Sequence, residues 1–269
     1  MSRSTAARSA RSTRRPHRTR THRTARIATV GVAAVSAGAI ALGLSGCAFL
    51  GPLHEFSDSA SVAATVAHVT IDSPDDSVEV RGVAGATGVS IERTVRYRGP
   101  EREIGDTHRV DGDELVLGGC GRNCSVAYTV EVPVGVDVSG ETSNGELDLE
   151  DVGEVDVETS NGRIELTDVA GSVSASTSNG AIVGRGLAGH GIDVDTSNGE
   201  IDLELVTAQD VAADTSNGSI EITVPDAAYR VDAHTSNGST DIGVADDPDG
   251  EFELVLGSSN GAITVSVDD

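Results

Sequence analysis

The sequence predicts an all-β fold: a single-stranded parallel β-solenoid (β-helix-like) of about seven regular coils, preceded by irregular N-terminal coils. Three observations predict it. A four-residue word recurs at a near-constant step, apolar and polar residues alternate on both sides of it, and large aromatic residues are scarce. The 269-residue chain has no Trp, three Tyr and three Phe. A slim coil interior of aliphatic side chains would exclude large rings.

The repeated word is Thr-Ser-Asn-Gly, or Ser-Ser-Asn-Gly in the last copy, and its asparagines are separated by 17, 18, 19, 19, 20 and 23 residues. We interpret each copy as a structural bend, because Gly adopts a positive φ at little cost and Asn tolerates the same region. Stacked Asn and Thr side chains could also bond to one another from coil to coil. The predicted bend ladder consists of Asn144, Gly145, Asn161, Gly162, Asn179, Gly180, Asn198, Gly199, Asn217, Gly218, Asn237, Gly238, Asn260 and Gly261.

The residues on both sides of each bend alternate with a period of two. Six and four residues before Asn most units carry an aliphatic or small residue, such as Val155 and Val157, and two before comes Thr or Ser. Three and five residues after Asn most units carry Ile, Leu or Val, such as Ile164 and Leu166. This pattern is typical of half-buried strands, so each unit is expected to be strand, bend, strand and second bend.

An antiparallel β-meander is the alternative fold, because a two-residue Asn-Gly connection is a strong hairpin signal. A meander gives no reason for Thr and Ser to recur before every Asn-Gly. In a solenoid, equivalent residues lie about 4.8 Å apart and form ladders of identical side chains. We therefore favour the solenoid.

The first 46 residues have a different composition. Residues 1–26 contain nine Arg and no acidic residue, and residues 27–46 are uncharged and rich in Ala, Gly, Val, Ile and Leu. This pattern indicates an export signal over residues 1–46. The end of this stretch, Leu44-Ser45-Gly46-Cys47, resembles the lipobox of bacterial lipoproteins. That resemblance implies cleavage before Cys47, lipid modification of Cys47, and attachment to the membrane on its extracytoplasmic side; an uncleaved membrane span is the alternative.

The remaining chain is divided as follows. We interpret residues 47–60 as the lipidated N-terminus and a tether, and residues 61–269 as one solenoid domain, with irregular capping coils over 61–135 and the repeats over 136–269. Cys120 and Cys124 form an even, closely spaced pair in a chain expected to be exported. Such a pair predicts a disulfide.

The charge of the chain excludes some partners. The net charge is −24, and all 43 acidic residues lie after residue 54, together with 10 of the 19 arginines and no lysine. A surface of this sign repels nucleic acid, so we expect no nucleic-acid partner. Four residues after the repeated Asn stands an acidic ladder, broken by Val183: Asp148, Glu165, Asp202, Glu221 and Asp241. A solvated face is the favoured interpretation, a divalent-cation module the alternative, and no metal or cofactor is expected.

The repeated Thr-Ser-Asn-Gly bends, flanked by Val-x-Val and Ile-x-Leu behind a lipoprotein-type leader, resemble the bacterial "putative adhesin" β-strand-repeat domains of unknown function. The Cys-x-x-x-Cys of Cys120 and Cys124, followed by the Val-Pro-x-Gly-Val stretch at 132–136, is also similar to members of that family. The resemblance covers roughly residues 61–269. It implies a β-solenoid and a cell-envelope setting.

The sequence indicates no catalytic residues. Gly257-Ser258-Ser259-Asn260-Gly261 fits Gly-x-Ser-x-Gly, but a hydrolase elbow requires strand, turn and helix, whereas Ser259 belongs to a repeated bend followed by strand residues. We therefore expect a non-enzymatic, lipid-anchored envelope protein that binds, adheres or scaffolds at the bacterial surface. A cell-wall polymer or another envelope protein is the expected partner, and a carbohydrate-active enzyme is the alternative function.

Overall fold

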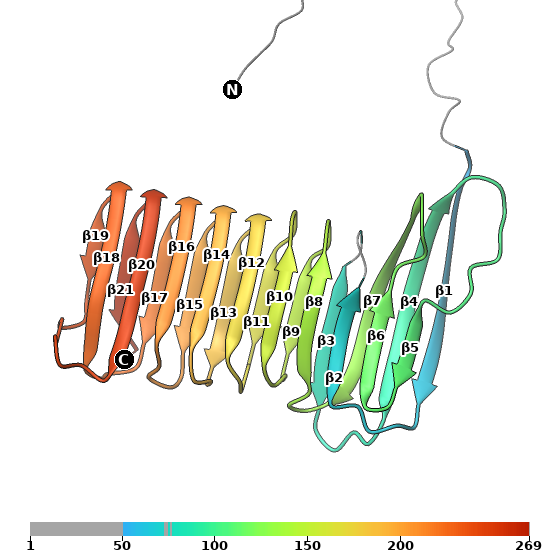
Figure 1. Ribbon diagram of the computed structural model, residues 1–269, viewed down its shortest axis with the longest axis horizontal. Coiled ribbons are helices and arrows are strands. Elements are labelled where there is room, and N and C mark those ends of the chain that lie inside the picture. Colours follow the sequence, from blue (N-terminus) through green and yellow to red (C-terminus); the bar gives the residue numbers. More distant parts are fainter. Residues whose placement is uncertain (1–50, 73–74, 76, 269) are drawn as a thin grey trace, which may run out of the picture. The chain divides into compact units, whose positions relative to one another are not determined.

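The computed structural model describes residues 51–72, 75 and 77–268, and every regular element in this part of the chain is a β-strand (Figure 1). Residues 1–46, including the expected export signal, and Cys47 lie outside the described residues. In the part that is described, no helix has the length and hydrophobicity needed to cross a membrane.

The strands form two sheets that face each other. Sheet A has eleven strands in the order β1 (Leu53–Val62), β4 (Val89–Arg98), β7 (Cys124–Pro133), β3 (Val78–Val83), β9 (Leu147–Glu150), β11 (Ile164–Thr167), β13 (Ile182–Leu187), β15 (Ile201–Leu205), β17 (Ile220–Val224), β21 (Ile263–Val267) and β19 (Thr240–Ile242). Sheet B has ten strands in the order β18 (Tyr229–Asn237), β20 (Phe252–Asn260), β16 (Val211–Asn217), β14 (Ile192–Asn198), β12 (Val173–Asn179), β10 (Val155–Thr159), β8 (Asp137–Thr142), β2 (His68–Asp72), β6 (Glu114–Gly118) and β5 (His108–Asp111).

Each repeat forms one coil, with its first strand in sheet B and its second in sheet A. Strands of neighbouring coils are parallel and in register: Val155 lies opposite Val173, and Asn179 opposite Asn198. The predicted β-solenoid is therefore confirmed. The antiparallel meander is wrong for the repeat region, because all pairs between regular coils are parallel.

The core lies between the sheets and is built from the inward positions of each coil. Ile164, Leu166, Ile201 and Leu203 are fully buried. In the sixth copy, by contrast, Val231 and the inward residues after it are only partly buried. The reason is that this copy has a neighbouring coil on one side only.

The repeated bends are joined by two ladders of side-chain hydrogen bonds. In each successive coil the Asn Nδ2 donates to the Asn Oδ1 of its neighbour at 2.9–3.1 Å, from Asn161→Asn144 through to Asn237→Asn260. The buried hydroxyl two residues earlier donates to the carbonyl oxygen of the neighbouring bend glycine at 2.9–3.2 Å, as in Thr196→Gly180. These bonds satisfy polar groups that would otherwise be unpaired between coils.

The bend glycines are needed for a reason that differs from the sequence interpretation. Positive φ is found at glycines such as Gly85 and Gly140, but at none of the repeated Asn-Gly pairs. Instead, a Cβ at Gly162, Gly180, Gly199, Gly218, Gly238 or Gly261 would lie only 1.7–1.9 Å from the carbonyl oxygen of the adjacent bend glycine. The expectation of a positive φ at Gly199 is wrong, and close approach of neighbouring backbones excludes a side chain there.

The last three copies are not stacked in chain order. β20 lies between β16 and β18, and β21 lies between β17 and β19. The seventh copy is thus inserted between the fifth and the sixth. The sixth copy, with β18 and β19, is the outermost coil at the left of Figure 1.

The N-terminal end shows the same kind of insertion. β2 and β3 lie between the coil of β8 and β9 and the coil of β6 and β7. Strands β1, β4 and β5 then extend the two sheets by antiparallel pairing, so the region before the repeats is only partly coiled. β1 includes most of the segment interpreted from sequence as a tether, so regular β-structure already covers residues 53–60.

A buried arginine forms hydrogen bonds to several segments at this N-terminal end. The Arg93 side chain is 5% exposed, and its Nε and Nη2 donate to the Asp58 carboxylate at 2.5 and 2.7 Å. Its Nη1 donates to the Gly105 carbonyl and the Thr107 hydroxyl, both at 2.9 Å. A single guanidinium thus joins β1, β4 and the loop before β5.

Candidate functional site

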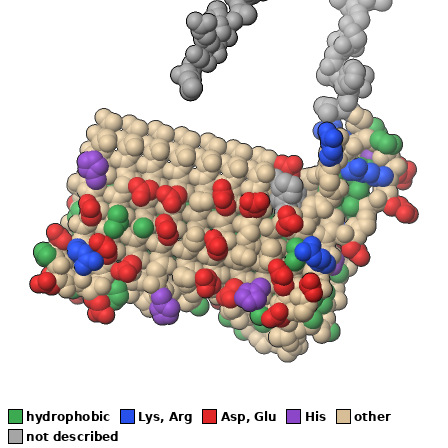
Figure 2. Space-filling view, viewed as in Figure 1, with side chains coloured by type: hydrophobic (Ala, Val, Ile, Leu, Met, Phe, Trp, Pro, Cys, Tyr) green, Lys and Arg blue, Asp and Glu red, His purple; other side chains and the backbone are tan. Residues whose placement is uncertain are grey.

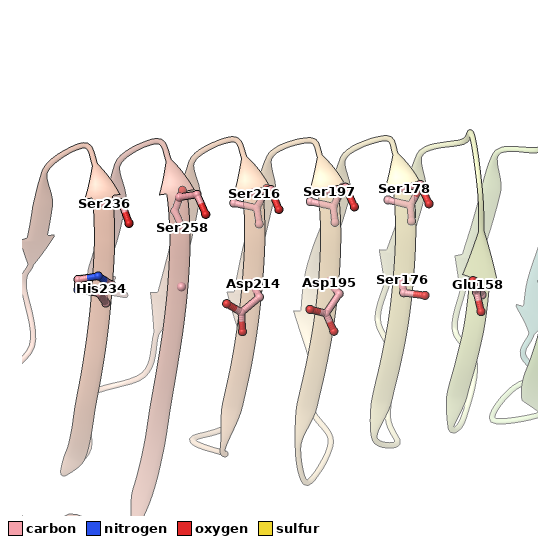
Figure 3. Close-up of a pocket in the computed structure, with 15 residues that line it drawn as sticks. Glu158, Ser176, Ser178, Asp195, Ser197, Asp214, Ser216, His234, Ser236 and Ser258 are labelled. Carbon is pink, nitrogen blue, oxygen red and sulfur yellow. The ribbon is translucent and has the colours of Figure 1, made fainter.

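The outer face of sheet B carries a groove that crosses several coils (Figure 3). It has a volume of about 480 Å³ and is lined by two rows of outward side chains. We call it the serine–carboxylate groove. Its upper row consists of the bend serines Ser178, Ser197, Ser216, Ser259 and Ser236. They line up because each precedes the repeated Asn, whose register is shared by all coils.

The lower row stands two residues earlier on the same strands. In spatial order it consists of Glu158, Ser176, Asp195, Asp214, Gly257 and His234. Successive outward residues of a strand lie on one face of the sheet, so the two rows run parallel across the coils. Figure 3 shows the carboxylates of Asp195 and Asp214 side by side, below the serine row.

The surroundings of Asp195 in the groove destabilise its ionised carboxylate. Partial burial, followed by the negative charges of Asp193 and Asp214, raises the pKa of the Asp195 carboxyl above its ordinary value. Gly257 leaves space beside this pair, because a Cβ there would lie 2.0 Å from Asp214 Oδ1. The Asp214 carboxylate therefore extends over the inserted seventh coil, towards the coil of His234.

A second hollow, of about 400 Å³, continues the groove along sheet B and shares Glu158 and Ser176 with it. The sheet B strands from β8 to β16, which lie beneath the second hollow and most of the groove, contain no arginine, lysine or aromatic residue, whereas β18 and β20 at the outer end of the groove contain Arg230, Tyr229 and Phe252. Among the described residues, no ion pair involves Glu158, Asp195 or Asp214. Figure 2 shows red carboxylates across this face, below a band of uncharged side chains and backbone.

The acidic ladder predicted from sequence lies on the opposite face, on the outside of sheet A. Asp148 and Glu165 are neighbours, Val183 separates Glu165 from Asp202, and Thr264 separates Glu221 from Asp241. The ladder therefore has a second break, which arises because the seventh copy is inserted between the fifth and sixth.

Arginines neutralise part of this ladder. Arg163 Nε lies 3.2 Å from Glu165, and Arg185 forms a two-pronged pair with Asp202. Further along, Arg81 contacts Glu150 at 2.6 Å and Glu79 at 2.9 Å. At Asp148 burial is the largest influence, and it raises the carboxyl pKa together with the charges of Glu165 and Glu79.

The other residues singled out from the sequence lie as follows. Cys120 and Cys124 are joined by a disulfide, with a Cα–Cα distance of 5.6 Å, just before β7. Ser259 lies within β20 and is followed by β21, so no helix follows it as a nucleophile elbow requires. Within the described residues no group of three or more His, Cys, Asp or Glu is placed to hold a metal ion.

Sequence reasoning did not single out the serine–carboxylate groove. Its signal was present in the outward positions one and three residues before the repeated Asn. These positions carry only small, acidic or histidine residues and no arginine, whereas the positions flanking the sheet A ladder include Arg163 and Arg185.

The fold is a parallel β-solenoid whose coils are joined by ladders of Asn and hydroxyl hydrogen bonds. The outer face of its sheet B carries a groove. The chain belongs to the family described as Toastrack DUF4097, whose pattern matches residues 61–269. The resemblance noted from the repeats is thus confirmed at the level of the family.

Solved structures were also found to be similar to the chain. A "putative adhesin" from Parabacteroides distasonis ATCC 8503 is 13% identical, over 80% of this chain and 97% of that chain, with a TM-score of 0.44. A "putative adhesin" from Parabacteroides merdae ATCC 43184 is 15% identical, over 78% of this chain and 95% of that chain, with a TM-score of 0.43. The comparison with curated proteins found no match.

Proposed function

We propose that this protein is a non-enzymatic, lipid-anchored component of the bacterial envelope, and that its solenoid binds an extended polymer or an envelope partner in the serine–carboxylate groove. The observation that carries the proposal is the groove itself. It runs across successive coils, so it offers one serine hydroxyl per coil at about the 4.8 Å strand spacing, with the carboxylates of Asp195 and Asp214 on two adjacent coils. A ligand with repeated groups can contact several coils at once.

The contrast between the two faces supports a ligand that carries amino groups. Some carboxylates on sheet A, such as Glu165 and Asp202, have arginine partners, whereas Asp195 and Asp214 have none among the described residues. Partial burial first, and then the charges of Asp193 and Asp214, raise the pKa of Asp195, and an opposite charge nearby would stabilise its carboxylate. Bound ammonium groups would supply it, and the serine hydroxyls would accept or donate hydrogen bonds beside them.

A binding function predicts that the groove does not cleave polysaccharides. Incubation with a panel of polysaccharides should therefore produce no new reducing or unsaturated ends. Their appearance would favour the carbohydrate-active enzyme instead.

The groove is tested by a binding comparison between two double variants. Asp195→Asn with Asp214→Asn removes two groove charges, and Glu221→Gln with Asp241→Asn removes two charges from the outside of sheet A. Chitosan oligomers serve as the amine-bearing probe and dextran as the neutral one. We expect the groove variant to lose at least about tenfold in affinity for chitosan, which corresponds to about 1.4 kcal/mol, and the control variant to bind like the natural protein. Equal losses in both variants would mean that net charge, and not the groove, attracts the probe.

The envelope attachment is tested separately. Cys47→Ser should release the protein from the membrane fraction, because it removes the residue expected to carry the lipid. Unchanged membrane retention would favour an uncleaved span. A pull-down from envelope extract, with the groove variant as its control, would identify the natural partner.

A further inference from the structure

Seven bends have nearly the same sequence, but one of them has a different environment. The bend glycines Gly145, Gly162, Gly180, Gly199, Gly218 and Gly261 are buried or half-buried, whereas Gly238 is exposed. The difference follows from the strand order. Gly238 belongs to the sixth copy, whose strands β18 and β19 end sheets B and A.

The backbone nitrogens of Gly199, Gly218 and Gly261 differ from that of Gly238 in the same way. Gly199 N donates to Asn217 O at 3.1 Å, and Gly218 N donates to Asn260 O at 3.0 Å. Gly261 N donates to Asn237 O at 3.1 Å. Each of these nitrogens is held by the next coil outward. No coil among the described strands lies beyond Gly238, so its nitrogen has no such acceptor.

We infer that Asn237 is a site of spontaneous deamidation, and that the bends of Asn198, Asn217 and Asn260 are protected by the coil stack. The Gly238 nitrogen attacks Asn237 Cγ and loses its proton. A bond forms between Gly238 N and Cγ, the Cγ–Nδ2 bond breaks, and the side-chain nitrogen leaves as ammonia with that proton. Water then opens the cyclic imide at either carbonyl and leaves aspartate or isoaspartate at position 237. The reaction needs no oxidant, reductant or cofactor.

The edge position makes this reaction faster than elsewhere for two reasons. The nucleophile is free at Gly238, and the terminal coil opens more readily than coils packed on both sides. At Asn198 or Asn217 the same attack requires a glycine nitrogen to leave its acceptor and the coil to separate from its neighbour. An opening cost of about 1.4 kcal/mol already slows the reaction about tenfold.

Deamidation would weaken the docking of the sixth copy. Asn237 Nδ2 donates to Asn260 Oδ1 at 3.1 Å and to Ser259 O at 3.3 Å. A carboxylate at this position cannot donate, and it places negative charge against two oxygen atoms. The terminal coil would therefore detach more easily after the reaction.

The test uses the natural folded protein in a mildly alkaline buffer. Peptide mapping by mass spectrometry follows the conversion of each Asn to Asp or isoAsp over time, and a sample in denaturant serves as the reference. We expect conversion at Asn237 at least about tenfold faster than at Asn198, Asn217 and Asn260 in the folded protein, with similar rates at all four in denaturant.

The near-identical local sequences make the interior bends matched controls. Asn237→Gln should remove the early product and leave the other rates unchanged. Similar rates at Asn237 and Asn217 in the folded protein would overturn the inference. So would faster conversion at Asn198, Asn217 or Asn260 than at Asn237. The inference would also fail if all four asparagines convert in denaturant but none of them converts in the folded protein.

Discussion

Replacing Gly199 by Ala tests whether bend glycines are required by close packing between coils. The new Cβ would lie 1.8 Å from the Gly180 carbonyl oxygen, so the two coils must separate locally. That oxygen accepts the Thr196 hydroxyl at 3.0 Å, and the adjoining Asn198 donates to Asn179 Oδ1 at 3.1 Å. Both hydrogen bonds would be stretched or broken by the separation.

The expected loss of stability follows from these contacts. Overpacking costs about 1–3 kcal/mol, and each lost hydrogen bond costs about 0.5–1.5 kcal/mol. We therefore expect the free energy of unfolding to fall by about 2–6 kcal/mol. For a domain of this size that corresponds to a decrease in Tm of roughly 4–24 °C.

Thermal unfolding followed by circular dichroism, together with chemical denaturation, measures the effect. Two glycines provide matched controls. A Cβ added at Gly191 would meet no atom within 4 Å, and Gly191 has no positive φ, so Gly191→Ala should stay within about 0.5 kcal/mol of the natural protein. Gly85 has a φ of 79° and open space around it, so Gly85→Ala should cost about 1–2 kcal/mol from backbone strain alone. A Gly199→Ala variant as stable as Gly191→Ala would refute the close-packing explanation.

Two further predictions concern charged residues. Asp58→Ala should destabilise the fold by about 3 kcal/mol in denaturant titrations, because it leaves the buried Arg93 guanidinium without its anionic partner, whereas Arg93→Met should cost less because the Asp58 carboxylate that it leaves is half exposed. The hydrogen bond from Arg93 lowers the pKa of Asp58, so the stability that this pair contributes is present above the ordinary pKa and is lost as the pH falls through the lower folded-state value. Asp195→Asn should raise Tm at neutral pH, because burial and the charges of Asp193 and Asp214 raise the pKa of Asp195 and disfavour its carboxylate in the fold. This gain should vanish at a pH below the ordinary pKa of aspartate, where Asp195 is protonated in both states, and a gain that persists there would contradict the electrostatic cause.

The sequence predicts the coil and its core because both depend on short-range regularities. The step between bends sets the coil length, and alternation around residues such as Val155 and Ile164 places the same columns inward. Register follows as well, since Asn179 and Asn198 align only when whole repeats are superposed.

The spatial order of the coils does not follow from the same regularities. Every copy has the same Ser-Asn-Gly bend. The fifth copy could therefore pair with either the sixth or the seventh and form the same Asn and hydroxyl hydrogen bonds. The contacts that distinguish them lie outside the repeated word, for example the Glu253 amide, which donates to Asp210 Oδ1 at 2.8 Å, and Tyr229 against Phe252, whose ring centroids are 6.0 Å apart. These contacts become recognisable only when the neighbours are known.

The sequence predicts neither the groove nor the reason why the bends need glycine, and the two omissions have related causes. Glycine is required both by a positive φ and by a close backbone approach, so composition alone does not distinguish the two at Gly199. The groove depends on which outward residues are neighbours across coils. Asp214, Gly257 and His234 are adjacent only because the seventh copy lies inside the stack.

The inserted seventh copy has a consequence for the order of folding. β18 pairs with β20 alone among the named strands, and β19 pairs with β21 alone. During synthesis the sixth copy emerges first, while its final neighbour is still unmade. We expect it to stay undocked, or to pair temporarily with β16 and β17, until β20 and β21 displace it. Docking of the sixth copy at its final position therefore depends on strands that are synthesised after it.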